Sequence, residues 1–150
     1  MKLLFICTGN TCRSPMAEYL ARDYIKKNNI RNIEVSSCGI MPDIGEAANP
    51  NAVTVMDELG IDISAHRAKR LEAEEITGYD IFAVMSPSQL ALLSQCGVDP
   101  DRIVILGGGI HDPYGSGVET YRMTRDRLKT AVTQLIDTVL KISSGGEAEK

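Results

Sequence analysis

The chain has 150 residues, of which 43% are apolar and 24% are charged, and its formal net charge is −4. This size and balance indicate one globular domain that needs no disulfide staples, and the acidic total argues against nucleic acid or an anionic membrane surface as the main partner. No apolar run approaches the roughly 18 residues that span a bilayer, and TGNTCRS follows MKLLFIC at once, so neither a signal peptide nor a membrane segment is predicted and a cytoplasmic location is expected.

The first half of the chain predicts two strands and two helices. KLLFI, residues 2–6, is a continuous apolar run typical of a strand covered on both faces. After a polar loop, Ser14-Pro15 predicts a helix start with a capping hydroxyl and a proline in the first turn, and Asn28-Asn29 ends that helix. The remaining elements of this half are a strand over 33–37, a loop over 38–48 and a helix from Asn49-Pro50 to about Leu59, which Gly60 stops.

The second half predicts two more strands and two more helices. The strands lie at 80–85 (DIFAVM) and 103–106, and Ser86-Pro87 opens a helix that runs to about Gln95. A glycine-rich loop over 107–117 precedes a long helix from about Val118. The apolar face of this helix recurs at steps of four and three: Leu128, Val132, Leu135, Val139 and Ile142. SSGGEAEK, residues 143–150, predicts a disordered tail after a single domain over 1–142.

Alternation of short apolar strands with helices predicts an α/β fold. We expect a single-domain, four-stranded parallel sheet with helices on both faces. In such sheets, ligands bind just beyond the carboxyl ends of the strands. CTGNTCRS follows the first strand and DPYG, which begins at Asp112, follows the fourth, so both segments are predicted to lie at this edge.

CTGNTCRS, residues 7–14, has the features of an anion-binding loop. Between a strand's carboxyl end and a helix amino terminus, a loop presents unpaired backbone N–H groups, and the helix dipole adds partial positive charge. Gly9 permits a positive φ and Asn10 tolerates one next best, so the N–H groups from Thr8 to Arg13 can turn inward as a nest. The planar fork of Arg13 matches two phosphate oxygens.

Cys7 lies at the base of this predicted cradle. The N–H groups, Arg13 and the helix terminus all favour thiolate over thiol, and a thiolate in line with phosphorus is a strong nucleophile. The Ser14 hydroxyl is placed to hydrogen-bond the sulfur. An ordinary strand-to-helix turn with incidental cysteines is the alternative, but it would not gather all of these residues on one loop. The nucleotide-binding patterns GxxxxGK[ST] and GxGxxG are both absent from the sequence.

The cysteines and histidines do not predict a metal site. The sequence has no close CxxC pair, and neither His66 nor His111 has a neighbouring histidine, so we expect no metal and no other cofactor. Cys38 and Cys96 are predicted to be small buried apolar side chains. His111 is predicted to be a solvated loop residue.

Four segments of the chain are similar to segments of one protein family. Cys-x5-Arg-Ser begins at residue 7, and DPYG precedes the last helix; VSSCGI is similar to a SAG-type segment, and ELGIDISAHRAKRL to a GI-D-x-S-x-H-x-A-R-x-L segment. With these features the chain resembles the low-molecular-weight protein tyrosine phosphatases over nearly its whole length. The resemblance implies a Rossmann-like fold and a cysteine-dependent protein phosphatase that works through a cysteinyl-phosphate intermediate.

The resemblance also implies roles for individual residues. The catalytic residues would be Cys7 as the nucleophile, Arg13 as a phosphate ligand and Asp112 as the general acid. The residues of the phosphate-binding loop would be Thr8, Gly9, Asn10, Thr11, Cys12 and Arg13. Those that hold this loop in shape would be Asn10, Ser14, Ser37 and His66. Cys12, five residues after the nucleophile, would form a reversible disulfide with Cys7.

Thr11 and Tyr114 bear on the choice of substrate. In the resembled family, members that act on phosphotyrosine usually carry an aliphatic residue at the Thr11 position, whereas the protein arginine phosphatases carry threonine in CTGNTCRS. A hydroxyl can bond a guanidinium leaving group, while an aromatic ring prefers an apolar contact. We therefore expect phosphoarginine on proteins as the substrate, with phosphotyrosine as the alternative because Tyr114 supplies one aromatic side.

Two other functions fit the sequence less well. Arsenate reductases share this fold and loop but need two further cysteines close together on a mobile segment, and Cys38 and Cys96 lie far apart in the sequence. A non-catalytic phosphate-binding module would be favoured only if Cys7, Arg13 or Asp112 were missing. The expected partners are phosphorylated proteins, with no nucleic acid and no membrane, and the expected state is a monomer or weak homodimer.

Overall fold

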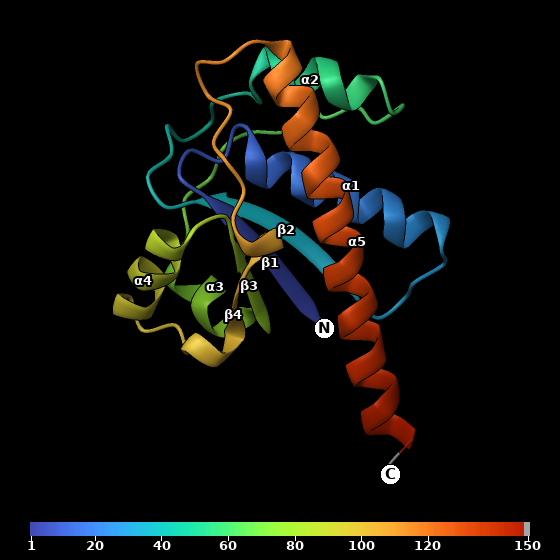
Figure 1. Cartoon of the computed structure of the whole chain (residues 1–150). Helices are drawn as coiled ribbons and strands as arrows, with labels where there is room; N and C mark the ends of the chain where they lie inside the picture. The colour runs from blue at the N-terminus through green and yellow to red at the C-terminus, as the bar shows by residue number, and fades with distance from the viewer. Residues whose placement is uncertain (149–150) are drawn as a thin grey trace.

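The computed structural model describes residues 1–148 and contains a parallel sheet of four strands in the order β2-β1-β3-β4 (Figure 1). The strands are β1 (Lys2–Cys7), β2 (Glu34–Gly39), β3 (Ile81–Val84) and β4 (Ile103–Ile105). β1 lies between β2 and β3, with Cys7 opposite Gly39 and Ile6 opposite Val84. The predicted α/β class and the four-stranded parallel sheet are confirmed.

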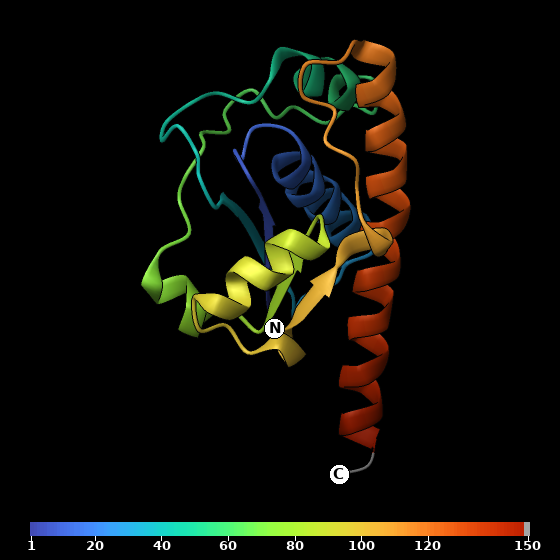
Figure 2. The same cartoon turned by 60° about the vertical axis from the view of Figure 1, so that its left-hand side comes forward.

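Helices cover both faces of this sheet (Figures 1 and 2). On one face lie α1 (Arg13–Lys27), α2 (Pro50–Asp57) and α5 (Val118–Ala148), and on the other lie α3 (Ala73–Gly78) and α4 (Pro87–Gln95). Alternate residues of a strand point to opposite faces. Leu3 and Phe5 of β1 accordingly join the core with α1, α2 and α5, whereas Leu4 and Ile6 pack beside Leu93 of α4.

Three of the helices begin where the sequence predicted: α2 at Pro50, α4 at Pro87 and α5 at Val118. Asn49 caps α2 by accepting a hydrogen bond from the Asn51 N–H, and Ser86 caps α4 by accepting one from the Gln89 N–H. Each cap is followed directly by proline, whose fixed φ suits the first turn and whose missing N–H costs nothing there.

The start of α1 and the end of β2 differ from the prediction. α1 begins at Arg13, so Ser14 lies inside the helix and is not its cap. β2 continues through Cys38 to Gly39, because these residues pair with the last two residues of β1 in register. α3 was not predicted. It is a six-residue helix that begins with a capping box between Glu72 and Glu75.

The carboxyl-terminal helix corrects two further expectations. α5 runs to Ala148, so residues 143–148 are helical rather than a disordered tail, and residues 149–150 lie outside the described residues. Extending an existing helix costs far less than nucleating one, which is how it continues through Ser and Gly. Its final turns project beyond the sheet (Figures 1 and 2), and Ile142 is accordingly 65% exposed instead of joining the core.

Cys96 is also exposed, which corrects the expectation of a buried side chain, whereas Cys38 is buried as predicted. Cys96 caps the carboxyl end of α4, and its backbone N–H closes the last turn on the carbonyls of Leu92 and Leu93. None of the helices within residues 1–148 combines the length and the hydropathy that crossing a bilayer would require.

Candidate active site

The loop between β1 and α1 leads into an open helix amino terminus. The N-cap of α1 is Cys12, and it makes no side-chain capping bond. The first N–H groups of the helix therefore stay available to an anion, at the end where the helix dipole is positive. Asn10 turns the chain in the middle of the loop with a left-handed φ of 55°, whereas Gly9 does not adopt a positive φ. The sequence had allowed either residue to make this turn.

Asn10 fixes the loop through its side chain and its carbonyl. Its Nδ2 donates to Ser14 Oγ at 2.8 Å and to Ser37 Oγ at 3.0 Å, and its Oδ1 accepts from the Lys69 N–H at 3.0 Å. His66 Nε2 donates to the Asn10 carbonyl at 2.7 Å. Because Asn10 is fully buried, none of these bonds competes with water. The structure therefore brings together the four residues that were expected to hold the loop in shape.

The thiol of Cys7 is hydrogen-bonded at the base of the loop. Its sulfur lies 2.8 Å from Ser14 Oγ, and both residues are buried. Asn10 already donates a hydrogen bond to Ser14 Oγ, so the Ser14 hydroxyl acts as a donor. Its two acceptors are the Cys7 sulfur at 2.8 Å and the Cys38 carbonyl at 3.4 Å, and the sulfur is the nearer one. A donor aimed at sulfur favours its charged form, which is the nucleophilic one.

A buried carboxylate ends this hydrogen-bond chain. Ser37, the second serine that Asn10 contacts, donates to Glu18 Oε1 at 2.6 Å. Glu18 is only 7% exposed, and its other oxygen accepts from Arg22 Nε at 2.8 Å, which compensates its charge. The role of Glu18 was not predicted from the sequence. The only signal was its position directly after Met16 and Ala17, on the buried first turns of α1.

Arg13 reaches across to the loop that carries Asp112. Its Nη1 donates to the Ile110 carbonyl at 3.0 Å, and its Nη2 lies 3.6 Å from Asp112 Oδ2. The Ile110 N–H bonds in turn to the Met85 carbonyl at the end of β3. Arg13 is 6% exposed, whereas half of the Asp112 side chain is open to solvent. A fixed guanidinium thus faces an accessible carboxyl group.

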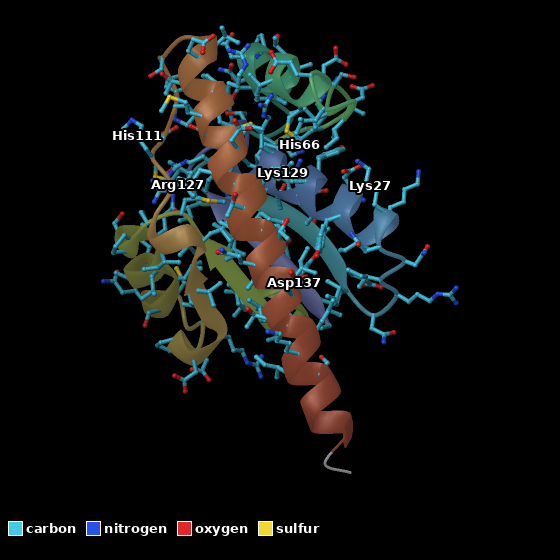
Figure 3. All side chains as sticks on the ribbon, turned by 45° about the vertical axis from the view of Figure 1, so that its right-hand side comes forward. Lys27, His66, His111, Arg127, Lys129 and Asp137 are labelled. Carbon is cyan, nitrogen blue, oxygen red and sulfur yellow. The ribbon has the colours of Figure 1, made fainter. Side chains whose placement is uncertain are left out.

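Three consecutive glycines lead into the Asp112 loop. Gly107, Gly108 and Gly109 all have positive φ, at 59°, 75° and 125°, which lets the chain reverse sharply after β4. His111 lies on the outer side of this loop and is exposed, as expected (Figure 3).

These groups line one open pocket of about 240 Å³. Its floor is the loop after β1, and its walls come from the loop after β2 and from the Asp112 loop. The lining residues are Cys7, Thr8, Gly9, Thr11, Cys12, Arg13, Met41, Asp43, Glu46, Asp112 and Tyr114. The two segments expected at the carboxyl edge of the sheet therefore meet there.

Cys12 lines the same pocket in a different environment. It is 5% exposed, and its sulfur lies 3.3 Å from the Tyr121 hydroxyl and 3.8 Å from Thr11 Oγ1. Burial raises the pKa of the Cys12 thiol, and hydrogen bonds from Tyr121 and Thr11 offset only part of this effect. Cys12 therefore keeps its proton at neutral pH.

Two further residues support the loop from neighbouring strands and helices, and the sequence analysis did not single them out for this. Gln89 of α4, which is buried, accepts from the Met85 N–H at 2.7 Å and donates to Thr8 Oγ1 at 3.3 Å. Gly39 allows the loop to approach β2, since a Cβ there would lie 2.8 Å from the Thr8 carbonyl oxygen. Within residues 1–148, no three His, Cys, Asp or Glu side chains gather as a metal site would require.

Known proteins share this architecture. Residues 2–144 match the family model described as "Low molecular weight phosphotyrosine protein phosphatase", and the chain therefore belongs to this family of low molecular weight protein phosphatases. A protein-arginine-phosphatase of Geobacillus stearothermophilus is 33% identical over 144 residues, which cover 91% of this chain and 94% of that protein. A low molecular weight protein-tyrosine-phosphatase of Acinetobacter johnsonii is 42% identical over 93 residues, which cover 62% of each chain.

The fold agrees closely with that of a solved arginine phosphatase. The structure of the YwlE arginine phosphatase, as a cysteine-to-serine mutant with a phosphorylated active-site serine, superposes with a TM-score of 0.89 at 31% identity. The match covers 94% of this chain and 97% of that one. The low-molecular-weight phosphatase fold predicted from the sequence is confirmed.

Proposed function

We propose that this phosphatase hydrolyses phosphoarginine on proteins, with Cys7 as the phosphate acceptor. The observation that carries the substrate assignment is the pocket wall, where a threonine hydroxyl and two carboxylates stand around the nucleophile. The pocket also holds a guanidinium, from Arg13, and an accessible carboxyl group, from Asp112, which are the two groups that phosphate transfer to a thiolate needs besides the nucleophile.

In the first step, the Cys7 sulfur attacks phosphorus in line with the leaving group, and the phosphorus–nitrogen bond breaks. Ser14 stabilises the thiolate before attack, at 2.8 Å. Arg13 and the loop N–H groups receive the charge on the equatorial oxygens. The phosphate takes the place of Asp112 as a partner of Arg13, and Asp112 gives a proton to the departing guanidino nitrogen.

In the second step, water attacks the cysteinyl phosphate while Asp112 accepts its proton. The sulfur–phosphorus bond breaks, inorganic phosphate forms, and the Cys7 thiolate returns. The phosphorylated serine in the YwlE structure supports this route, since the phosphoryl group there sits on the residue that replaces the active-site cysteine.

Thr11 offers the substrate a hydroxyl. It lines the pocket, and its Oγ1 has a weak contact of 3.8 Å with the Cys12 sulfur. The hydroxyl can therefore accept a hydrogen bond from an N–H of the substrate guanidinium. An aromatic ring at the same place would leave the hydroxyl without a partner, which costs free energy in a partly buried site.

Two carboxylates make the rim of the pocket negative. Asp43 and Glu46 flank a tight turn, closed by a hydrogen bond of 3.0 Å from the Glu46 N–H to the Asp43 carbonyl, with Gly45 at φ 88°. Two hydrogen bonds of 2.8 Å to Ala68 fix the turn in place. Neither carboxylate takes part in an ion pair within residues 1–148. Phosphoarginine brings a cationic guanidinium to this rim, whereas an aryl phosphate brings only negative charge.

Phosphotyrosine is the second candidate substrate, with the same mechanism. Tyr114 and Met41, which are 73% and 77% exposed, stand at the mouth of the pocket and could pack against a ring. Arsenate reduction would need two further cysteines close together. Cys38 is buried in β2 and Cys96 is exposed at the end of α4, so the two do not form the close pair that a disulfide relay needs.

Cys7 and Cys12 also support oxidative control through a reversible disulfide. Both line the pocket, and a disulfide between residues five positions apart would close only a short loop of the chain.

All four cysteines of the chain are free thiols, as in proteins of a reducing compartment, which supports a cytoplasmic location.

The substrate assignment is tested with two peptides of the same sequence, one carrying phosphoarginine and the other phosphotyrosine. We expect a higher kcat/KM for phosphoarginine in the wild-type protein. Thr11→Ile should then shift the preference toward phosphotyrosine by roughly ten- to a thousandfold, because a ring gains about 1 kcal/mol of apolar contact and the guanidinium loses about 1–3 kcal/mol with its hydrogen-bond partner.

Thr130→Ile, on the exposed side of α5, is the matched control and should leave the ratio unchanged. A wild-type preference for phosphotyrosine would refute the substrate assignment. An unchanged ratio in Thr11→Ile would show that Thr11 does not select the substrate.

A further inference from the structure

The Tyr121 hydroxyl, near the start of α5, forms a hydrogen bond with the Cys12 thiol. It lies 3.3 Å from the Cys12 sulfur, in a side chain that is fully buried, and no other hydrogen bond to it occurs within residues 1–148. A thiol is a weak partner for a buried hydroxyl. Phenylalanine would fill the same space without burying a polar group. Packing therefore accounts for the ring of Tyr121 and leaves its hydroxyl to be explained by Cys12.

This hydrogen bond stabilises the Cys12 sulfur substantially only when Cys12 is a thiolate. Burial holds the pKa of the Cys12 thiol above its ordinary value, and the bond from Tyr121 is the largest of the effects that lower it. The phosphatase steps make no use of Cys12 as a nucleophile, since Cys7 supplies the attack on phosphorus. The remaining reaction for a second thiol in this pocket is attack on Cys7 itself.

We propose that Tyr121 is a positioning residue for Cys12 in its reaction with oxidised Cys7, an inference that rests on Cys7 being the reactive thiol of the proposed function. Tyr121 holds the Cys12 sulfur in the pocket and donates a hydrogen bond to it as the sulfur loses its proton. Without this support, oxidised Cys7 survives longer and meets a second oxidant molecule.

The chemistry begins with a peroxide as the oxidant. The Cys7 thiolate attacks hydrogen peroxide, a sulfur–oxygen bond forms, hydroxide leaves, and Cys7 becomes a sulfenic acid. The Cys12 sulfur then attacks the Cys7 sulfur, so that a disulfide forms, the sulfur–oxygen bond breaks, and the departing hydroxide takes the Cys12 proton and leaves as water. A dithiol reductant returns the two electrons. A second peroxide instead gives the sulfinic acid, which thiols do not reduce.

The test compares wild type, Tyr121→Phe, Cys12→Ser and Tyr24→Phe. Tyr24→Phe is the matched control, because it removes a tyrosine hydroxyl from a hydrogen bond of 2.6 Å to Asp137, away from the pocket. After timed exposure to hydrogen peroxide, mass spectrometry of alkylated peptides gives the fractions of Cys7 present as disulfide and as sulfinic acid. Turnover of p-nitrophenyl phosphate after dithiothreitol gives the recoverable activity.

We expect Tyr121→Phe to slow disulfide formation roughly ten- to a hundredfold, since a hydrogen bond to a charged group is lost. Its rate-against-pH profile should move to higher pH, and more Cys7 should end as sulfinic acid. The turnover of the reduced variant should stay within about twofold of wild type, which also shows that it folds. Tyr24→Phe should match wild type throughout.

The double variant Cys12→Ser/Tyr121→Phe should recover no worse than Cys12→Ser, because Tyr121 acts through Cys12. A wild-type rate and pH profile in Tyr121→Phe would overturn the inference, as would wild-type recovery in Cys12→Ser or an additional loss in the double variant. The measured quantity is the fate of the Cys7 sulfur. If the enzyme proves to prefer phosphotyrosine while Tyr121→Phe still slows the disulfide, only the phosphoarginine assignment fails.

Discussion

Asn10 gives the phosphate loop its shape at a single residue. It combines a left-handed φ with hydrogen bonds to Ser14, Ser37, Lys69 and His66, and it is fully buried. We expect Asn10→Ala to lower the free energy of unfolding by about 3 kcal/mol, because buried partners lose their bonds and alanine disfavours this φ. The same change should lower kcat/KM for p-nitrophenyl phosphate at least tenfold. Urea unfolding and steady-state kinetics measure the two effects.

Asn29→Ala separates the backbone cost from the hydrogen bonds. Asn29 is the other non-glycine residue within 1–148 that has a positive φ, at 52°, but it is exposed at the end of α1. Its replacement should cost about 1 kcal/mol and leave turnover unchanged. Equal losses in the two variants would mean that the hydrogen bonds of Asn10 contribute nothing.

The sequence predicted the residues whose relation is local. Cys7, Arg13 and Ser14 lie within eight residues of one another, so that spacing alone places the proposed nucleophile, a cation and a hydroxyl around the proposed anion site. Glu18 and Tyr121 could not be found this way, because each is defined by a contact with a distant segment: Glu18 with Ser37 of β2, and Tyr121 with a residue 109 positions earlier. Only the tertiary structure shows that either side chain reaches the loop.

Glu58 joins the carboxyl end of α2 to α5. Its Oε1 accepts from Arg122 Nε at 2.9 Å and from Arg125 Nη1 at 2.6 Å. The bond from Arg122, together with that from Arg125, lowers the pKa of Glu58 from 4.5 to about 2. Because the pKa of the folded state is the lower one, the stabilisation is complete above about pH 4.5 and is lost as the pH falls through about 2.

Glu58→Gln should therefore destabilise the protein most at neutral pH. The difference in unfolding free energy between wild type and variant should shrink below about pH 4.5 and vanish below about pH 2. Urea unfolding across this range measures the difference. Glu34→Gln is the control, because the Glu34 side chain is 77% exposed and has only a 3.9 Å ion pair with Lys2. A pH-independent difference for Glu58→Gln would show that its charge plays no part.

Elements were predictable where local signals agree. α2 and α4 each carry a polar cap followed by proline, and the apolar runs of β1 and β3 identify buried strands. α3 was missed because half of its six residues are polar, none of them is buried, and its cap is a glutamate rather than serine or threonine. The cap of α1 was placed two residues late, at Ser14 instead of Cys12, because Ser14, an excellent capping type, is used instead for the Cys7 sulfur. The contact of Ser14 with the Cys7 sulfur therefore outweighs the preference of serine for the N-cap position.

We expect the projecting end of α5 to contribute little to the stability and the activity of the protein. Among the α5 residues up to 143, Val139 is the last that is buried in the core, and residues 141–143 are exposed. A protein ending at residue 142 should keep kcat/KM within about twofold and the free energy of unfolding within about 0.5 kcal/mol of the full chain. Circular dichroism melting and p-nitrophenyl phosphate turnover measure these quantities.

A protein ending at residue 127 is the contrasting case. It lacks Leu128, Val132 and Ile136, which are buried against the sheet face that carries α1. Each of these side chains contributes about 1.5–3 kcal/mol by burial, so this shorter protein should not fold. A cooperative thermal transition in it would contradict this view of α5.

The position of β1 at the centre of the sheet has a consequence for biosynthesis. β1 is made before the other three strands of the sheet, but it pairs only with β2 and β3, and Tyr121 reaches Cys12 only from α5. Chains grow at about 5–20 residues per second, so roughly 5 to 20 s separate the synthesis of Cys12 from that of Tyr121. During that interval both pocket thiols are held on an unfinished chain. Cys12 therefore has no hydrogen bond from Tyr121 until α5 has been made and has packed against the sheet.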